Sequence, residues 1–332
     1  MHLFTEGQIG HLTLKNRVVM APMCMYSADE AGFVQPFHFS HYTARAYGGV
    51  SLIIQEATAV EPRGRISDHD LGIWDDAHVI GLKKLVDDVH LAGSKIAIQL
   101  AHAGRKCTVK TEKIIAPENV AFNEKYATPV AMQDKDIEDV IRAFKHGARR
   151  ARLSGYDGIE LHGAHGYLIN QFISPLTNQR TDKYGGSLEN RARFLLDIIA
   201  AVREEWQGPL WVRLSADEYA EGGHHIHETL ELTKLLLGKV DAINVSSGGV
   251  VPIVPKAFPG YQLPLAQAIK AQGMTVIGGG LITNENQIEQ ALEQHQLDFV
   301  YLARELLLNP YFVLRVAKNH APEHQLKAYE RG

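Results

Sequence analysis

The sequence predicts an α/β fold of the (β/α)8 TIM-barrel type, with eight parallel strands and intervening helices in a single domain spanning residues 1–332. A length of 332 residues suits one such barrel. Short apolar runs recur eight times and lack strict alternation, as expected for parallel strands buried on both faces. Helical patterns separate most of these runs. The alternative, an open doubly wound sheet, would place a G-x-G-x-x-G turn after the first strand, and none follows it.

The predicted strands are residues 17–20, 50–55, 95–100, 158–161, 210–214, 242–245, 275–277 and 299–302. Apolar residues at helical spacing predict helices over 137–148, 194–202 and 230–236, and Ser187 is expected to cap the second of them. Gly7 and Gly10 flank a turn within residues 1–16, which predicts a short β-hairpin that closes the barrel floor. The long connections 103–135 and 248–264 are expected to cover a functional site.

Composition and charge narrow the classes of function. Hydrophobic residues make up 45% of the chain and charged residues 22%, which is typical of a globular protein with a large core. A net charge of -4 without a basic block argues against a nucleic-acid partner. No apolar run approaches the roughly 20 residues of a membrane span and no signal-peptide pattern opens the chain, so we expect a cytoplasmic protein. Cys24 and Cys107 form neither a disulfide framework nor a Cys-x-x-Cys metal site.

Two imidazoles and a phenol gather where the fourth predicted strand ends. His162, His165 and Tyr167 lie within six residues, and glycines between them allow a tight backbone turn. In barrels of this type the active site is built at the carboxyl ends of the strands. Such a cluster can hold a substrate oxygen from two sides and offer a proton from a third position. A structural role for the histidines remains the alternative on spacing alone.

The exits of other strands suggest a phosphorylated cofactor. Gly279 and Gly280 follow strand seven, and Ala303 and Arg304 follow strand eight, where barrels commonly bind phosphate. Small residues let backbone N–H groups approach a phosphate, and the arginine adds a charged fork. Arg213 on strand five can stabilise negative charge on a ring system, and the amide of Gln99 on strand three can bind a polar ring edge. Together these groups suggest flavin mononucleotide (FMN) across the barrel mouth.

Several long segments of the sequence match the pattern of one known family. They are Asn16-Arg17 with Ala21-Pro22-Met23-Cys24-Met25-Tyr26, then residues 99–106, 162–168, 171–175, 178–182 and 184–191. In these segments, and over nearly its whole length, the chain resembles the old yellow enzyme family of FMN-dependent ene-reductases. It is most similar to the bacterial, thermophilic-type NADPH dehydrogenases of that family. One position departs from the family pattern, because Ala303 stands where a glycine usually precedes the strand-eight arginine.

The resemblance implies a role for each matching residue. Flavin contacts are expected from Ala21, Pro22, Met23, Cys24, Ala57, Gln99, Arg213, Gly279, Gly280, Ala303 and Arg304, with Cys24 near the reactive edge and Ala303 and Arg304 at the phosphate. His162 and His165 should bind a carbonyl or nitro oxygen, Tyr26 should touch the substrate, and Tyr167 should deliver a proton. NADPH or NADH would be the reductant. The tail 322–332 would carry Arg331 into the neighbouring active site of a homodimer or homotetramer.

Three rival functions remain open on sequence. A metal-dependent barrel hydrolase could use His162 and His165 as ligands, but Arg213 and Arg304 make the barrel mouth cationic and no metal is expected. An FMN barrel that reduces tRNA uridine would carry a basic helical appendage, and no such segment is present here. A flavin-binding protein without catalysis would not need both oxygen binders and a proton donor.

Overall fold

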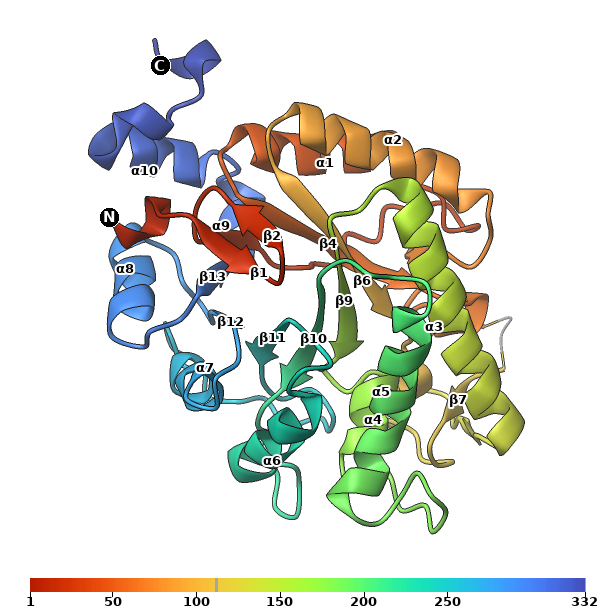
Figure 1. Ribbon diagram of the computed structural model, residues 1–332. Coiled ribbons are helices and arrows are strands. Elements are labelled where there is room, and N and C mark those ends of the chain that lie inside the picture. The colour runs from red at the N-terminus through yellow and green to blue at the C-terminus, as the bar shows by residue number, and fades with distance from the viewer. Residues whose placement is uncertain (111–112, 332) are drawn as a thin grey trace.

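Eight parallel strands close into a barrel in the computed structural model, which describes residues 1–110 and 113–331 (Figure 1). The sheet order β3-β13-β12-β11-β10-β9-β6-β4 is closed by pairing of β3 with β4, and every neighbouring pair is parallel. The prediction of a (β/α)8 barrel is therefore confirmed. The barrel strands are β3 (Val18–Met20), β4 (Leu52–Ala59), β6 (Lys95–Ala101), β9 (Gly158–Gly163), β10 (Leu210–Ser215), β11 (Ala242–Ser246), β12 (Val276–Gly278) and β13 (Phe299–Leu302).

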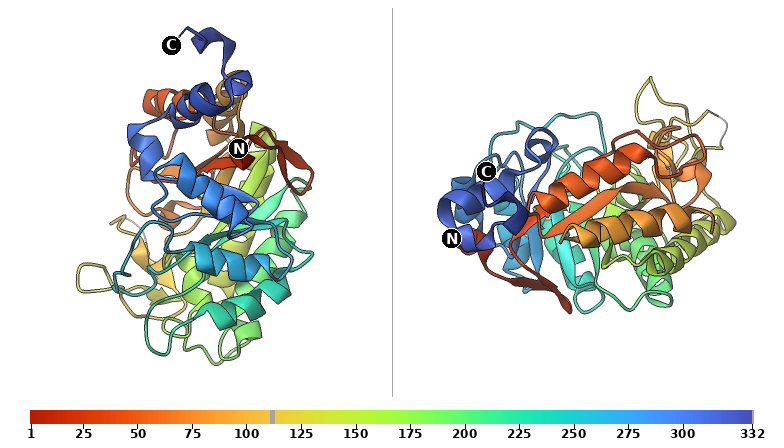
Figure 2. Two further views of the ribbon diagram at one scale, coloured as in Figure 1. Left: turned by 90° about the vertical axis from the view of Figure 1, so that its left-hand side faces the viewer. Right: turned by 90° about the horizontal axis from the view of Figure 1, so that it is seen from above.

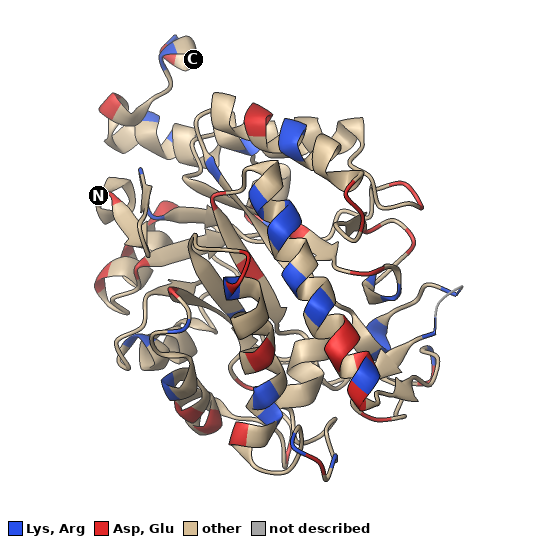
Figure 3. Cartoon of the chain, turned by 45° about the vertical axis from the view of Figure 1, so that its right-hand side comes forward, with Lys and Arg blue, Asp and Glu red and all other residues tan. Residues whose placement is uncertain are grey.

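Helices surround the strands on the outside of the barrel (Figure 1). Ser187 caps α5 as predicted, since its Oγ accepts a hydrogen bond from the Asn190 backbone N–H at 3.4 Å. Acidic and basic residues are both distributed over the outer helices (Figure 3). The helices are α1 (Pro36–Tyr47), α2 (His78–Leu91), α3 (Asp134–Ser154), α4 (Leu168–Ile173), α5 (Leu188–Arg203), α6 (Ile226–Leu236), α7 (Leu263–Lys270), α8 (Glu285–Glu293), α9 (Arg304–Leu308) and α10 (Phe312–His320).

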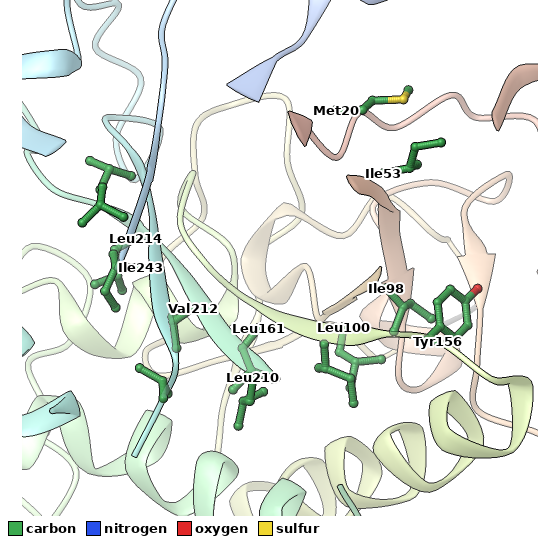
Figure 4. Close-up of a cluster of buried hydrophobic side chains, with 14 of the residues drawn as sticks. Met20, Ile53, Ile98, Leu100, Tyr156, Leu161, Leu210, Val212, Leu214 and Ile243 are labelled. Atoms are coloured by element: carbon green, nitrogen blue, oxygen red, sulfur yellow. The ribbon is translucent and has the colours of Figure 1, made fainter. Parts of the chain in front are cut away.

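The hydrophobic core has two layers. The outer layer lies between strands and helices and includes Ile98, Leu161 and Val212, which Figure 4 shows with their neighbours. The inner layer fills the barrel and includes Trp211 and Phe299. Because successive strand residues face opposite sides, Leu161 and Val212 face the helices, whereas Glu160 and Trp211 face the interior. This alternation decides which residues of each strand can reach the barrel mouth.

A short hairpin closes the barrel floor, as the sequence predicts. Strands β1 (Gly7–Ile9) and β2 (Leu12–Leu14) pair antiparallel. Ile9, Leu12 and Leu14 are buried in the same cluster as Trp211 and the other inward-facing residues of the barrel. The floor is thus sealed by apolar side chains, which leaves the opposite end as the open face.

The second barrel strand differs most from its predicted bounds. The sequence predicts a strand over 50–55, whereas β4 continues to Ala59 with its register to β6 shifted between Gln55 and Ala57. This β-bulge places the charged Glu56 outside the ladder, where it accepts a hydrogen bond from Tyr42 of α1 at 3.0 Å. Glu56, a charged residue within an otherwise apolar strand, therefore marks a bulge, and β4 continues beyond it to Ala59.

The long connections and the tail carry their own short elements. The 103–135 connection contains η3 (Gly104–Lys106) and the paired β7 (Ile115–Ala116) and β8 (Val130–Ala131), and part of this expected cover, residues 111–112, lies outside the described residues. The C-terminal segment, with η4 (Pro322–His324) and η5 (Lys327–Tyr329), projects beyond the barrel in Figure 1 and in the left view of Figure 2. The remaining elements are η1 (His2–Phe4), η2 (Pro62–Gly64) and β5 (Leu71–Gly72). Within the described ranges, no helix is long and apolar enough to cross a membrane.

Candidate active site

Strands β9 and β10 bring the histidine cluster beside an arginine at the open end of the barrel. His162 belongs to β9, so the strand extends two residues further than predicted, and its register partner on β10 is Arg213. The ring centroids of His162 and His165 are 5.2 Å apart, and those of His162 and Tyr167 are 4.7 Å apart. The three side chains that the sequence singles out therefore form one contiguous group.

Glycine gives this segment its tight turn. Gly166 has a φ of +72°, and a Cβ there would lie 2.2 Å from the backbone oxygen of Gly249. His165 also adopts a left-handed conformation, with a φ of 58°. Its backbone N–H donates to Ser215 Oγ at 2.9 Å, and its Nε2 lies 2.7 Å from Ser246 Oγ. Contacts from β10 and β11 thus hold a strained residue in place.

The hydrogen bonds of His162 determine which ring nitrogen carries its proton. Nδ1 of His162 accepts the Ala164 backbone N–H at 3.3 Å, so the neutral ring has its proton on Nε2. Burial lowers the pKa of His162 and His165 well below the ordinary value, and the charges of Arg213 and Lys106 lower both further. Both rings are therefore neutral at physiological pH, and His162 offers an N–H donor.

Tyr167 is a protonated phenol within the same group. Burial raises its pKa well above the ordinary value of 10.0, and the nearby Cys24 and Tyr26 raise it further. Nζ of Lys106 lies 5.2 Å from the Tyr167 ring centroid and donates to the His165 carbonyl oxygen at 2.9 Å. Burial lowers the pKa of Lys106 to about 8. A cation thus lies directly beside the phenol.

A cavity of about 450 Å³ opens beside this group, lined by residues from β10 to α9. Both predicted cations, Arg213 and Arg304, line it, together with Gly280 and Ala303. Gly279 does not line it, because the missing Cβ of Gly279 makes room for the Tyr301 ring, whose atoms would lie 2.7 Å away. Ala303 has φ -118° and ψ -96°, an uncommon conformation for alanine and consistent with the glycine usual at this position.

The cavity has the donor set that a flavin phosphate ester requires. Nε of Arg213 is buried and has no hydrogen-bond partner among the described residues, although buried donors are normally paired. The guanidinium of Arg213 lies 5.3 Å from the ring centroid of Tyr301, whose hydroxyl donates to Gln262 Oε1. An unpaired cationic donor, a second arginine and a Gly280 backbone at φ +107° fit an anionic, planar ligand.

The segment after β3 forms another wall near the tyrosine. Ala21 is buried, and Pro22, Met23 and Cys24 follow it toward Tyr26, which is 52% exposed and has a φ of 51°. The Met25 backbone N–H donates to Glu56 Oε2 at 2.7 Å, which fixes this segment. Burial raises the pKa of Cys24, and the carboxylates of Asp70 and Glu56 raise it further, while the Ala57 backbone contacts it. Cys24 is thus a protonated thiol.

Three residues at or near the site had no role in the sequence prediction. Lys106 ends the segment 99–106 that matches the family pattern, and a lysine just after a strand exit is a signal for a functional role. Glu160 stood in a predicted buried strand, where a carboxylate between Ile159 and Leu161 is unusual. Ser246 lies just beyond the predicted strand 242–245 and had no predicted role, although it contacts His165.

Neither histidine belongs to a metal-ligating group. Within residues 1–110 and 113–331, the group of three suitable side chains is His2, Glu289 and Glu293. Two of its carboxylate oxygens already accept the backbone N–H groups of His2 and Leu3. The arrangement at the barrel mouth instead consists of neutral imidazoles, a phenol and cations.

The fold and this site define a flavin-dependent oxidoreductase built on a barrel. The chain belongs to the NADH:flavin oxidoreductase / NADH oxidase family, whose model matches residues 2–323. It is 53% identical over 313 residues to the NADPH dehydrogenase of Halalkalibacterium halodurans, covering 93% of this chain and 92% of that protein. It is 52% identical to the NADPH dehydrogenase of Geobacillus sp. (strain WCH70), covering 99% and 98% of the two chains.

Solved structures agree with this assignment. Morphinone reductase superposes with a TM-score of 0.84 at 29% identity, over 96% of this chain and 90% of that chain. A 2-naphthoyl-CoA reductase superposes with a TM-score of 0.91 at 28% identity, and this chain spans 52% of its length. The resemblance to the old yellow enzyme family is thereby confirmed, and FMN and a nicotinamide reductant are the cofactors of this enzyme class. Membership in this family sets aside the hydrolase and tRNA-reducing alternatives.

Proposed function

We propose that this enzyme reduces the activated C=C bond of α,β-unsaturated carbonyl compounds, and also nitro compounds or quinones, with NADPH or NADH as the reductant. The observation that carries the proposal is the neutral His162 and His165 pair beside the protonated Tyr167, next to the cavity with two arginines. FMN, when bound, supplies the hydride that reaches the β-carbon of the alkene. The groups that bind the activating oxygen and donate the proton belong to the protein.

The residues that would hold FMN lie at the open end of the barrel. Arg304, with the backbone of Gly280 and Ala303, would hold the phosphate, and Gly279 would support them from behind through its packing on Tyr301. Gln99 and Arg213 would bind the ring, and Ala57 with residues 21–24 would line it. The roles of Arg213, Arg304, Gly280 and Ala303 are supported by the cavity that they line and by the unpaired Arg213 Nε within the described residues.

The histidines act as an oxyanion-binding pair. As the alkene is reduced, negative charge develops on the activating oxygen, and two neutral N–H donors stabilise that charge where it forms. Ser246 orients His165, and the Ala164 N–H orients His162. Tyr167 then delivers its phenolic proton to the α-carbon, and Tyr26 contacts the substrate from the opposite wall. Lys106 beside the phenol lowers the cost of the phenolate left behind.

The C-terminal tail makes the active site a shared one in a homodimer or homotetramer. Leu308 is 92% exposed, and Tyr311 and Tyr329 pack on each other with centroids 5.8 Å apart while Tyr329 stays 40% exposed. The exposed apolar side chains and the projecting tail support a partner subunit, into whose active site Arg331 would reach. We place the enzyme in the cytoplasm, where Cys24 and Cys107 stay reduced.

Purified protein tests the function directly. It should be yellow, should bleach anaerobically on addition of NADPH, and should regain its colour on addition of cyclohexenone. Protein that binds FMN and is bleached by NADPH, but is not reoxidised by cyclohexenone, a nitroarene or a quinone, would contradict the proposed substrate class. Protein that binds no FMN would contradict the proposal as a whole.

A further inference from the structure

A carboxylate is buried in the middle of the barrel, one inward-facing layer below the histidines. Glu160 precedes His162 by two positions on β9, so both side chains face the interior. Its exposed fraction is 0%, and the barrel interior around it holds an apolar cluster that includes Trp211 and Phe299. Charged residues are seldom buried this completely unless they are paired. The oxygen-binding and proton-donating groups described above do not use it.

Three different strands direct an N–H group at this carboxylate. Oε1 of Glu160 accepts from Gln99 Nε2 of β6 at 2.7 Å. Oε2 accepts from Trp211 Nε1 of β10 and from Asn244 Nδ2 of β11, each at 2.7 Å. The contacts join residues 61, 51 and 84 positions apart in the chain. A hydrogen-bond network that joins four strands fixes the orientation of the Gln99, Trp211 and Asn244 side chains, because each of them donates to Glu160.

The carboxylate also acts on the arginine of the proposed flavin site. Arg213 follows Trp211 by two positions on β10 and pairs in register with Asn244. Burial raises the pKa of Glu160, and the charge of Arg213 and the three N–H donors act against that rise. A negative charge below Arg213 reduces the positive potential that this arginine presents at the barrel mouth.

The polarity of the Gln99 amide follows from this contact. The two oxygens of Glu160 take three N–H donors, which is the arrangement of an ionised carboxylate, and Gln99 turns its Nε2 toward it. The heteroatom that remains for another partner is Oε1, an acceptor. The polar edge of an isoalloxazine ring carries an N–H between two carbonyl groups, and an amide oxygen is complementary to that N–H.

We propose that Glu160 is a positioning residue for the flavin, which keeps the Gln99 amide oxygen available to the ring edge and offsets part of the charge of Arg213. This inference rests on the proposed function and names a residue outside the flavin contacts themselves. It predicts that Glu160 affects FMN affinity and reduction potential without touching the substrate.

Glu160→Gln separates hydrogen-bond polarity from packing. The new side chain has the same shape, and its Oε1 can still accept from Trp211 and Asn244. Its Nε2 would then face Gln99 Nε2, so the Gln99 amide must turn over and present a donor to the flavin. We expect FMN affinity, measured by quenching of FMN fluorescence, to fall by about tenfold. Loss of the negative charge should favour reduced over oxidised flavin by about tenfold, which is a rise of about 30 mV for a two-electron couple.

The double variant Gln99→Glu with Glu160→Gln reverses the polarity of the pair. The amide introduced at position 160 would accept from Trp211 and Asn244 and would donate to the carboxylate at position 99, which again offers an acceptor to the flavin. Because both side chains keep their size and the net charge is unchanged, FMN affinity should recover. Asp157→Asn is the matched control, since Asp157 accepts the Ile96 N–H at 2.9 Å at the amino end of β9. It should lower stability and leave FMN affinity and potential unchanged.

Each outcome of these FMN-binding experiments either supports or overturns the proposed role of Glu160. A Glu160→Gln protein with wild-type affinity and potential overturns the inference. A double variant that does not fold, or that binds FMN as weakly as the single variant, also overturns it. If the single variant does not fold, recovery of FMN binding in the double variant supports it. Wild-type protein that binds no FMN would instead contradict the proposed function, so the two failures are distinguishable.

Discussion

Replacing His162 with alanine is expected to slow alkene reduction by about 10²–10³-fold. The variant removes one N–H donor from the oxyanion-binding pair and leaves His165 in place. The structure gives this donor its role, because Nδ1 of His162 is occupied by the Ala164 N–H and the proton therefore resides on Nε2. His165→Ala should show a loss of the same size, since its ring is also neutral.

The size of the effect follows from the surroundings of the ring. His162 is 4% exposed, so water cannot easily replace the missing donor. A lost donor at a buried oxyanion site corresponds to about 2.7–4 kcal/mol of transition-state stabilisation. Because burial, Arg213 and Lys106 keep both imidazoles neutral, the wild-type rate should stay level as pH falls from about 7.5 to about 6. The free energy of unfolding should decrease below about pH 6.5, since unfolded histidines take up protons that the buried rings do not.

Single-turnover kinetics isolate this step. Enzyme reduced with dithionite is mixed anaerobically with cyclohexenone, and the return of flavin absorbance is followed, so that NADPH binding does not enter the measurement. His11→Ala is the control, because His11 is exposed in the turn of the floor hairpin. Reoxidation at the wild-type rate in both the His162 and His165 variants would remove the pair from the mechanism. A rate that rises as the histidines become protonated would contradict their neutral state.

Three further predictions concern the proton, the thiol and the tail. Tyr167→Phe keeps the ring and removes the hydroxyl, so alkene reduction should slow by about 10²–10⁴-fold; full-rate turnover of cyclohexenone would mean that water or another group supplies the proton. Cys24→Ala should shift the flavin reduction potential and leave turnover in place, because the thiol is protonated; an unchanged potential would favour an inert thiol, and a covalent substrate adduct on wild-type Cys24 would contradict a tuning role. Deletion of residues 329–332 should raise KM for substrate or NADPH with FMN still bound, because the charge of Arg331 is lost; wild-type kinetics with an unchanged sedimentation profile would refute a shared site.

The sequence by itself determined the barrel and the local part of the site. Eight buried apolar runs, each followed by helical or loop sequence, leave few ways to bury strands on both faces, and parallel strands then place their exits at one end. His162, His165 and Tyr167 are close in the chain, so their grouping required only a tight turn at Gly166. The capping of α5 by Ser187 and the floor hairpin were predictable for the same local reason.

Only the tertiary structure decided which distant groups act on one another. The pairing of Glu160 with Gln99, Trp211 and Asn244 depends on the register of four strands, and no local pattern encodes that register. The bulge at Gln55 turned Glu56 outward, and the Ala164 N–H selected the proton position on His162, both through backbone geometry that composition does not reveal. The sequence determines which chemical groups are present, whereas barrel closure determines their distances, burial and charge environment.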